Sequence, residues 1–276
     1  MGIQPFVKWA GGKRQLMDKL LEFMPKEYKH YYEPFVGGGA LLLELTPESA
    51  TINDFNKELV SVYRCLGDEE LFKSFYVICK EHEKNHCDEY YYKIRNLDRN
   101  KESYSEMSIA ERAARCVYLN KACFNGLYRV NGKGQFNVPS GKKEKVRCFD
   151  EENILALHKY FSETKPTILN GDFAEAVKDA KAGDFIYFDP PYDVVGEQSF
   201  TSYTSDGFGP DEQTRLRDLI KELTEKGVYV MASNANTPFI QELYKDFTIH
   251  IVPAKRMINS NAAGRGEVEE VIITNY

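Results

Sequence analysis

The feature that most restricts the fold is a short apolar run that stops at two prolines. Residues 183–188 read Gly-Asp-Phe-Ile-Tyr-Phe, and Asp189-Pro190-Pro191-Tyr192 follow directly. The aromatic and β-branched residues predict a buried parallel strand. Consecutive prolines continue neither a helix nor a strand ladder, so the chain leaves the strand in extended geometry. Open α/β sheets bind ligands beyond the carboxyl ends of their strands, which makes this turn a candidate site.

An earlier strand ends in a glycine-rich turn. Residues 31–36 are largely apolar, Gly37 and Gly39 lie in the turn, and an apolar helix pattern follows. The dinucleotide fingerprint G-x-G-x-x-G fails because Leu42 stands at the third glycine. A pyrophosphate clamp is therefore not expected, but the glycines still allow a ligand to approach the backbone closely.

An acidic residue follows the next predicted strand. Residues 50–52 lead into Asn53-Asp54, and an acid at this position is the expected partner for ribose hydroxyls. A glycine turn and Asp54, without the third glycine, predict a nucleoside ligand that lacks a pyrophosphate. S-adenosylmethionine fits that description.

The remaining strand and helix patterns predict the fold class. The predicted strands are 167–170, 185–188, 228–234, 248–253 and 270–276, and the predicted helices among them are 173–180, 210–225 and 239–245. No helix separates the last two strands, which implies an antiparallel edge on a mostly parallel sheet. We therefore predict an α/β, Rossmann-like fold with a mostly parallel sheet and an antiparallel edge strand.

A long helical block interrupts this series. Helix-period segments at 57–65, 69–84, 88–97 and 106–123 precede a predicted hairpin over 128–138. We interpret residues 57–160 as an inserted target-recognition domain, and residues 1–56 and 161–276 as the catalytic domain. A hairpin with Arg, Asn and Gln side chains suits reading of the DNA major groove. An ordinary hairpin with solvated polar side chains remains the alternative.

Composition and charge narrow the class of protein. The chain has 276 residues, 42% of them hydrophobic, and a net charge of −6, which argues mildly against a nucleic-acid partner. It contains no apolar run as long as a membrane span and no signal-peptide pattern, so a cytoplasmic protein without a membrane partner is expected. Three basic groups nevertheless fit a discontinuous phosphate-binding face. They are Lys8, Lys13 and Arg14; Lys142, Lys143, Lys145 and Arg147; and Lys255, Arg256 and Arg265.

Two other site types are not favoured. The Gly-Gly-Lys at residues 11–13 is followed by Arg14 instead of the Ser or Thr of a phosphate loop. Cys79, His82, His86 and Cys87 would share one face of a helix, but four ligands from a single helix rarely close a zinc tetrahedron. No metal is expected.

The Asp-Pro-Pro-Tyr turn suggests a specific chemistry. An exocyclic amine is a poor nucleophile because its lone pair is delocalised into the ring. If Asp189 and the Pro190 carbonyl accepted both amine hydrogens, the lone pair could be aimed at an electrophilic methyl group. Tyr192 would stack on the base, and a base in duplex DNA would have to rotate out of the stack.

Together, these motifs resemble the Dam family of DNA adenine-N6 methyltransferases. The matching segments are residues 6–13, 33–39, 125–131, 136–139 and 189–192, in the order of the family. The resemblance covers nearly the whole chain. It implies methyl transfer from S-adenosylmethionine to adenine in duplex DNA, with 5′-GATC-3′ as the site.

The resemblance also implies roles for individual residues. Those expected to contact the methyl donor are Trp9, Lys13, Phe35, Gly37, Gly39, Asp54, Asp172, Phe173 and Asp189. Those expected to contact DNA are Lys8, Phe124, Asn125, Leu127, Arg129 and Pro139. Asp189, Pro190 and Tyr192 are expected to form the pocket for the flipped adenine.

One segment departs from the family pattern. After Pro139 the family usually continues with an aromatic or small residue, Gly and Arg-Tyr-Lys, whereas residues 140–145 read Ser-Gly-Lys-Lys-Glu-Lys. The rival hypotheses are a methyltransferase acting on RNA or on a protein amide, which more often carries Asn at position 189, and a non-catalytic DNA-binding protein. A restriction nuclease acting in the same system is a further functional partner to consider.

Overall fold

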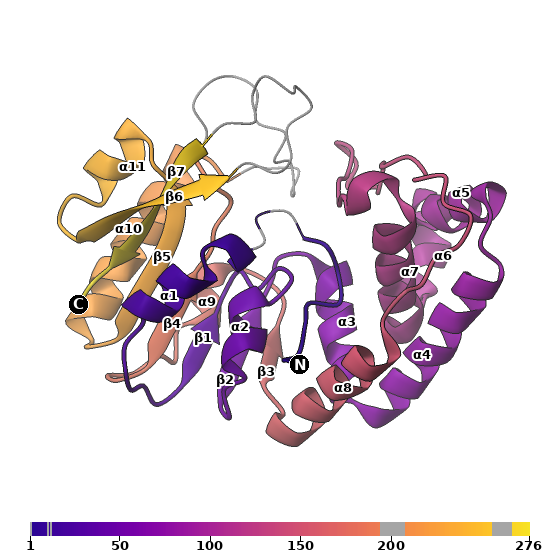
Figure 1. Ribbon diagram of the computed structural model, residues 1–276, viewed down its shortest axis with the longest axis horizontal. Helices are drawn as coiled ribbons and strands as arrows, with labels where there is room; N and C mark the ends of the chain where they lie inside the picture. The colour runs from indigo at the N-terminus through magenta and orange to yellow at the C-terminus, as the bar shows by residue number, and fades with distance from the viewer. Residues whose placement is uncertain (1, 10, 12, 194–207, 256–266) are drawn as a thin grey trace.

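The computed structural model describes residues 2–9, 11, 13–193, 208–255 and 267–276. Its centre is a seven-stranded sheet with the order β3-β2-β1-β4-β5-β7-β6 (Figure 1). The strands are β1 (Tyr31–Glu33), β2 (Ala50–Asn53), β3 (Thr167–Leu169), β4 (Phe185–Phe188), β5 (Tyr229–Ala235), β6 (Thr248–Lys255) and β7 (Glu267–Thr274). β1 to β5 pair in parallel, and β7 runs antiparallel to both β5 and β6. The predicted fold class is confirmed.

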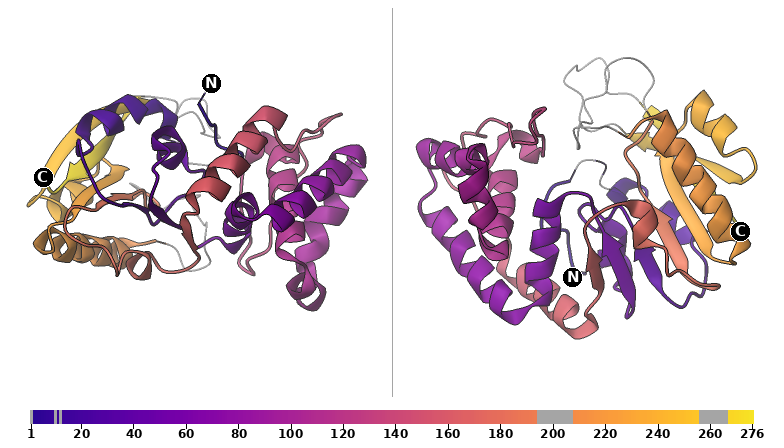
Figure 2. Two further views of the ribbon diagram at one scale, coloured as in Figure 1. Left: turned by 90° about the horizontal axis from the view of Figure 1, so that it is seen from below. Right: turned by 180° about the vertical axis from the view of Figure 1, so that it is seen from behind.

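The sheet is apolar on both faces because helices cover both. In β4, Phe185 and Tyr187 join one apolar cluster, while Ile186 and Phe188 join the other. This alternation is the period of two expected of a strand. One face is covered by α9 (Phe173–Ala176), α10 (Pro210–Glu225) and α11 (Pro238–Leu243), and the other by α1 (Met17–Phe23) and α2 (Ala40–Leu45) (Figure 2).

Residues 57–164 form a helical module beside the β3 edge of the sheet (Figure 1). Its helices are α3 (Lys57–Gly67), α4 (Glu69–Lys84), α5 (Asp88–Arg95), α6 (Lys101–Glu106), α7 (Ile109–Ala122) and α8 (Glu151–Thr164). Ser108 and Glu111 form a capping box at the start of α7, a helix with ten buried residues. The apolar cluster runs without a break from the sheet into this module. Our proposed domain boundary at residues 160 and 161 therefore lies inside α8 and within one continuous core.

Several predicted elements differ from those observed. The helix expected over 173–180 ends at Ala176, because successive three-residue turns replace it up to Ala180. The segment expected as one helix from 106 to 123 starts at Ile109, and α6 and α8 were not predicted. Three short 3₁₀ helices, η1 (Lys13–Gln15), η2 (Asn96–Arg99) and η3 (Phe124–Gly126), were also not predicted.

The predicted hairpin is present in a reduced form. Val130 and Phe136 form an isolated antiparallel bridge, and the chain reverses between Asn131 and Gln135. Its backbone bonds are Asn131 N–H to the Gln135 carbonyl at 2.9 Å and Asn137 N–H to the Arg129 carbonyl at 3.0 Å. No regular strand forms there; the Phe136 N–H and the Phe136 and Val138 carbonyls bond side chains of the helical module instead.

Candidate active site

The candidate site lies where the strand order reverses. β1 is hydrogen-bonded to β2 on one side and to β4 on the other, so the turns after these three strands share one edge of the sheet. The glycine turn follows β1, Asp54 follows β2, and Asp189 follows β4. Such a switch point is where open α/β sheets bind ligands.

Close packing requires glycine at positions 37 and 39, in the turn after β1. Gly37 has φ of 48° and Gly39 has φ of 68°, a region that L-residues rarely adopt. A Cβ on Gly37 would lie 2.9 Å from Cδ1 of Trp9, and one on Gly39 would lie 2.8 Å from the Tyr63 hydroxyl. Tyr63 also donates to the Gly37 carbonyl at 2.8 Å. Gly39 is therefore buried, while Gly37 is half-buried beside the Trp9 ring.

Asp54 is fixed by two backbone donors. Its Oδ2 accepts from the Gly37 N–H at 3.0 Å, and its Oδ1 accepts from the Asn56 N–H at 2.8 Å. Burial raises the pKa of Asp54 to about 6, and these two bonds oppose the rise. Each oxygen keeps a lone pair, so the carboxylate can accept the two hydroxyls of a ribose.

An aromatic pair lies beside this carboxylate. The Phe35 and Phe173 rings are 5.3 Å apart, and Phe208 packs against both. Asp172 caps α9 and pairs with Arg215 through two bonds of 2.8 and 2.5 Å. This guanidinium holds the pKa of Asp172 below its usual value. The structure thus brings Phe35, Phe173 and Asp172 together, with the Asp172 carboxylate already engaged.

Asp189 forms an ion pair at the end of β4. Lys13 Nζ lies 2.7 Å from Asp189 Oδ1, and its side chain is only 6% exposed. The same ammonium donates to the Gly11 carbonyl at 2.8 Å and lies 4.4 Å from the centre of the Tyr192 ring. Burial raises the pKa of Asp189 to about 6, and Lys13 opposes the rise. Lys13 and the Asp-Pro-Pro-Tyr turn, which are far apart in the sequence, therefore meet in the structure.

A second carboxyl group lies underneath. Glu33, at the end of β1, accepts from the Tyr31 hydroxyl at 2.8 Å and from the Leu42 N–H at 3.1 Å. Burial raises its pKa to about 8. Glu33 is thus mostly neutral at pH 7, which leaves the positive charge of Lys13 to Asp189.

Sequence reasoning missed two residues at this site. Glu270, on β7, accepts a hydrogen bond of 2.8 Å from the Tyr192 hydroxyl. Phe55 follows Asp54 directly and is 65% exposed, so an open aromatic face lies beside the carboxylate. Glu270 gave no local signal, because only the sheet order brings the antiparallel β7 near β4. Phe55 could have been found by its position after the predicted ribose partner.

The predicted DNA-contacting residues gather around η3. Asn120 of α7 accepts from the Lys8 N–H at 2.9 Å and donates to the Lys8 and Gly126 carbonyls at 2.8 and 2.9 Å. Phe124 is 53% exposed, and Asn125 has φ of 56°. The amino-terminal segment and the 124–126 turn are therefore joined through one buried amide, and both present side chains outward.

The remaining predicted DNA contacts lie on the hairpin. Arg129 is exposed and donates from Nε to Asn137 Oδ1 at 2.7 Å. Leu127 is half-buried, and the exposed Pro139 accepts from the Phe124 N–H at 3.0 Å. Lys8, Phe124, Asn125, Leu127, Arg129 and Pro139 thus form one continuous group.

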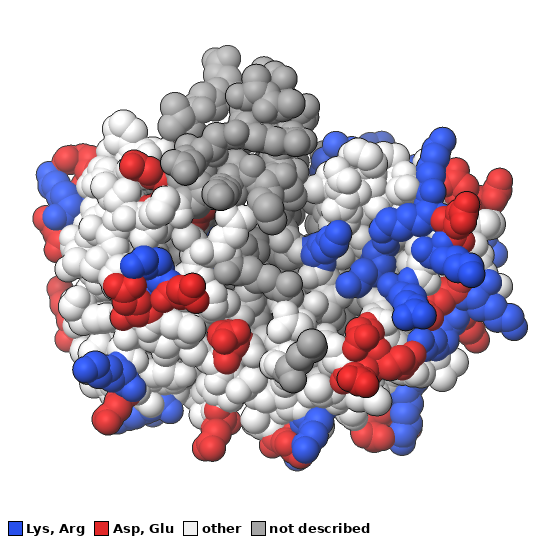
Figure 3. Space-filling view, in the orientation of Figure 1, with Lys and Arg blue, Asp and Glu red and all other residues white. Residues whose placement is uncertain are grey.

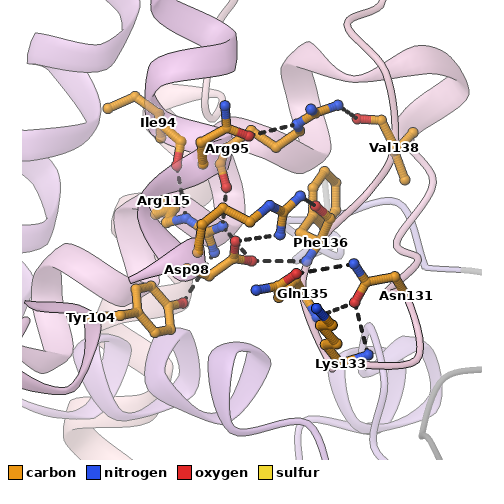
Figure 4. Close-up of polar contacts among 12 residues, drawn as sticks. Ile94, Arg95, Asp98, Tyr104, Arg115, Asn131, Lys133, Gln135, Phe136 and Val138 are labelled. Atoms are coloured by element: carbon orange, nitrogen blue, oxygen red, sulfur yellow. Dashed lines mark hydrogen bonds and ion pairs between the residues drawn. The ribbon is translucent and has the colours of Figure 1, made fainter. Parts of the chain in front are cut away.

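A network of charged side chains holds the hairpin on the helical module (Figure 4). Asp98 of η2 accepts from the Phe136 N–H at 2.8 Å and pairs with Arg115 at 2.8 Å. Arg99 donates to the Phe136 carbonyl at 2.6 Å, and Tyr91 donates to the Val138 carbonyl at 2.9 Å. The Asp98 and Arg115 side chains are 8% and 4% exposed. Sequence reasoning did not identify this support.

The hairpin and the glycine turn both pack against Trp9. Trp9 packs on Tyr128 with ring centres 5.0 Å apart, and Tyr128 packs edge-on against Phe136. Since Trp9 also covers Gly37, the Trp9 ring lies between the hairpin and the glycine turn.

The structure describes only part of the three basic groups that the sequence predicted as a phosphate-binding face. On the face in Figure 3, Lys and Arg side chains gather over the helical module, while the sheet half carries both signs. Residues 140–145, which depart from the family pattern, are tied to α7 by a bond from the Gly141 N–H to the Ala122 carbonyl at 2.9 Å. Arg256 and Arg265, with the side chain of Lys255, lie outside the described part of the protein.

The helix-face group of Cys and His residues is dispersed into separate contacts. His82 is hydrogen-bonded to the Tyr90 hydroxyl at 2.8 Å, and His86 to the Tyr118 hydroxyl at 2.7 Å. Cys79 is buried, whereas Cys87 is exposed and caps α5.

Among the described residues, no helix is long and apolar enough to cross a membrane.

The chain is similar to several known proteins. Residues 9–258 match the family of D12 class N6 adenine-specific DNA methyltransferases. The chain is 47% identical to the Type II methyltransferase M1.LlaDCHI of Lactococcus lactis subsp. cremoris, over all of this chain and 96% of that protein. It is 39% identical to the Type II methyltransferase M.MjaIII of Methanocaldococcus jannaschii, over the full length of both. It is 33% identical to the DNA adenine methylase of Vibrio cholerae, over 97% of this chain and 94% of that protein.

The family implies S-adenosylmethionine as the methyl donor and DNA as the substrate. The glycine turn, the Asp54 carboxylate and the Phe35–Phe173 pair fit a nucleoside with a short charged tail. The rival readings as an RNA or protein-amide methyltransferase are not supported by these relatives. The chain is an enzyme and belongs to the D12 class of N6 adenine-specific DNA methyltransferases.

Proposed function

We propose that the enzyme methylates N6 of an adenine rotated out of duplex DNA, within the site 5′-GATC-3′. The observation that supports this most directly is the position of Asp189. Its carboxylate lies at the switch point of the sheet, beside Lys13 and the Tyr192 ring, and across from the glycine turn. A carboxylate, a carbonyl and an aromatic face in one place suit a planar base with an amino group.

The carboxyl ends of β1 and β2 would hold the donor. Asp54 would accept the ribose hydroxyls, Phe35 and Phe173 would line the adenine with Asp172 alongside, and the exposed Phe55 ring lies next to Asp54. Trp9, Gly37, Gly39 and Lys13 would hold the amino-acid tail. When bound, S-adenosylmethionine supplies an electrophilic methyl group.

The acceptor base lies on the Asp-Pro-Pro-Tyr turn. Tyr192 stacks on the adenine, and its ring is held by the bond from its hydroxyl to Glu270. Asp189 and the Pro190 carbonyl accept the two hydrogens of the exocyclic amine, which localises the nitrogen lone pair and aims it at the methyl group. Lys13 pairs with Oδ1 of Asp189, so the second carboxylate oxygen can accept from the amine while the ion pair is kept.

Reading of the duplex is assigned to the group around η3 and the hairpin. Lys8 contacts the first guanine, and the exposed Phe124 ring inserts into the stack. Asn125, Leu127, Arg129 and Pro139 read the other base pairs. Arg129 is already held by Asn137, so little side-chain freedom is lost when it meets a guanine edge.

Two relatives are named Type II methyltransferases, which supports a role beside a restriction nuclease that cuts the same site. The nuclease is a functional partner, and no contact with it is proposed.

Transfer to plasmid DNA tests the proposal. Methylated plasmid is digested with nucleases that cut GATC and differ in their tolerance of N6-methyladenine, and the modified base is identified by mass spectrometry after hydrolysis. We expect protection only from the sensitive nuclease. Methylation of adenine in another sequence would refute the GATC assignment, and methylation of cytosine would refute the chemistry.

A further inference from the structure

The turn that carries Asp189 is anchored by two buried amide side chains. Gln213 of α10 donates from Nε2 to the Pro191 carbonyl at 2.9 Å. Asn234 of β5 donates from Nδ2 to Gln213 Oε1 at 3.0 Å and accepts from the Asp193 N–H at 3.0 Å. These bonds form a chain from Pro191 through both amides to Asp193, so the segment between them is held at both ends.

Because both amides are buried, the orientation of each one is fixed by its hydrogen-bond partners. Gln213 and Asn234 are each 1% exposed, and an unpaired amide at such depth costs free energy. Asn234 Oδ1 also accepts from the Ala235 N–H at 2.9 Å, which fixes which end of the Asn234 amide is the acceptor. The orientation of Gln213 follows, because its Oε1 must accept from Asn234 and its Nε2 must then donate to Pro191.

A third anchor lies at the far end of the turn. The Thr237 hydroxyl donates to Asp193 Oδ2 at 2.6 Å and accepts from the Ile240 N–H at the start of α11. Helix α10, strand β5 and the start of α11 therefore all contribute to holding residues 191–193.

We propose that Gln213 and Asn234 are positioning residues that set the direction of the Pro190 carbonyl and of the Tyr192 ring. This inference rests on the proposed function, in which that carbonyl accepts a hydrogen of the target amine. The pyrrolidine ring fixes φ of Pro191, so its ψ is the only soft rotation between the Pro190 and Pro191 carbonyls. The Gln213 bond restricts that rotation. Neither amide needs to touch the base or the donor.

The direction of the hydrogen bonds gives a sharp test, the substitution Gln213→Glu. A carboxylate at position 213 still accepts from Asn234 but faces the Pro191 carbonyl with a second acceptor, which repels it. When the carboxyl group is protonated, its O–H donates to Pro191 and restores the original bond. Activity should therefore be lost at high pH and recovered as the pH falls.

The experiment is steady-state methylation of a duplex oligonucleotide that contains the target site. At pH 8 we expect kcat of Gln213→Glu to fall about 10- to 100-fold, the size expected for a displaced reacting group, while KM for donor and for DNA stays near wild type. The ratio of variant kcat to wild-type kcat should rise as the pH is lowered. The matched control is Gln241→Glu, because Gln241 of α11 bonds Asn236 and not the turn. Its kcat should equal wild type at every pH.

Folding is followed by thermal unfolding and by donor binding, read from the fluorescence of Trp9, the single tryptophan of the chain. If Gln213→Glu does not fold, Asn234→Asp carries the test, because its carboxylate still accepts from the Asp193 N–H but faces Gln213 Oε1 with a second acceptor, and the same pH-dependent loss of kcat is expected. A wild-type kcat for a folded Gln213→Glu, or a pH ratio that stays flat, would overturn the inference. Full turnover by Asp189→Ala would instead overturn the proposed function itself, so the two failures are distinguishable.

Discussion

The Asp-Pro-Pro-Tyr turn and the hairpin proposed to read DNA are both irregular segments, but they are held in different ways. Residues 191–193 are anchored by neutral amides that are almost completely buried. The hairpin is anchored by a buried ion pair, Asp98 with Arg115, and by Arg99. Neutral anchors add no charge to those of Lys13, Asp189 and Glu270 at the proposed reacting centre. Charged anchors suit a segment that approaches phosphates, where a fixed positive potential is useful.

The two supports also differ in what a broken contact costs. An amide that loses one partner leaves an unsatisfied dipole, whereas a buried ion that loses its partner leaves an unpaired charge. Breaking an anchor of residues 191–193 should therefore lower kcat more than it lowers the free energy of unfolding. Breaking an anchor of the hairpin should lower the free energy of unfolding and base discrimination together.

The largest effect is expected at the reacting centre. Asp189→Ala removes the acceptor of the target amine, and we expect kcat to fall by at least about 1,000-fold. Donor binding should remain measurable, because Asp54 and the glycine turn are untouched. Single-turnover methylation and isothermal titration check the two parts. Undiminished methylation would show that the turn does not act on the amine.

Breaking the charged support of the hairpin should cost stability. Asp98→Ala leaves Arg115 buried without its carboxylate, and we expect the free energy of unfolding to drop by about 3–5 kcal/mol in urea titrations. The matched control is Glu70→Ala, which breaks an exposed ion pair with Lys73 and should cost less than about 1 kcal/mol. Equal losses in the two variants would mean that the buried pair has no special role.

Removing the exposed Arg129 side chain from the hairpin should affect sequence discrimination without affecting the fold. Arg129→Ala is expected to cost about 1–3 kcal/mol at one base pair of the site, because a bidentate contact to guanine is lost. Relative kcat/KM on duplexes with single substitutions measures this. Uniform weakening on every duplex would make Arg129 a phosphate contact instead.

The smallest effect is a shift in pH dependence. In the proposed mechanism, Asp189 accepts a hydrogen bond from the amine when its carboxyl group is ionised. The pKa of Asp189 is raised to about 6, so kcat/KM for the donor should fall as the pH drops through about 6. Lys13→Met removes the charge that lowers this pKa, so the acid limb should move to higher pH. Glu270 raises the same pKa, so Glu270→Gln should move the limb to lower pH. Acid limbs that coincide in all three proteins would assign the titration to another group.

Much of the fold followed from local pattern. The aromatic run at 185–188, the glycine turn and the amphipathic segment 210–225 all have strong periodic or steric signals, and each was found within a residue or so of its predicted place. The hairpin was weaker as a strand than predicted, because its backbone groups are used by Asp98, Arg99 and Tyr91. Such long-range partners leave no trace in a window of neighbouring residues.

The amino-acid sequence by itself determined the class of the sheet and pointed to the residues proposed to carry the chemistry. Two prolines after an apolar strand and glycines at positive φ are constraints that act over a few residues. Only the tertiary structure decided which distant groups support them. Gln213, Asn234 and Glu270 lie on elements that reach the Asp-Pro-Pro-Tyr turn through the strand order β4-β5-β7 and through α10 packed on that sheet. A buried polar contact depends on which elements pack together, and that is settled by burial of the whole core.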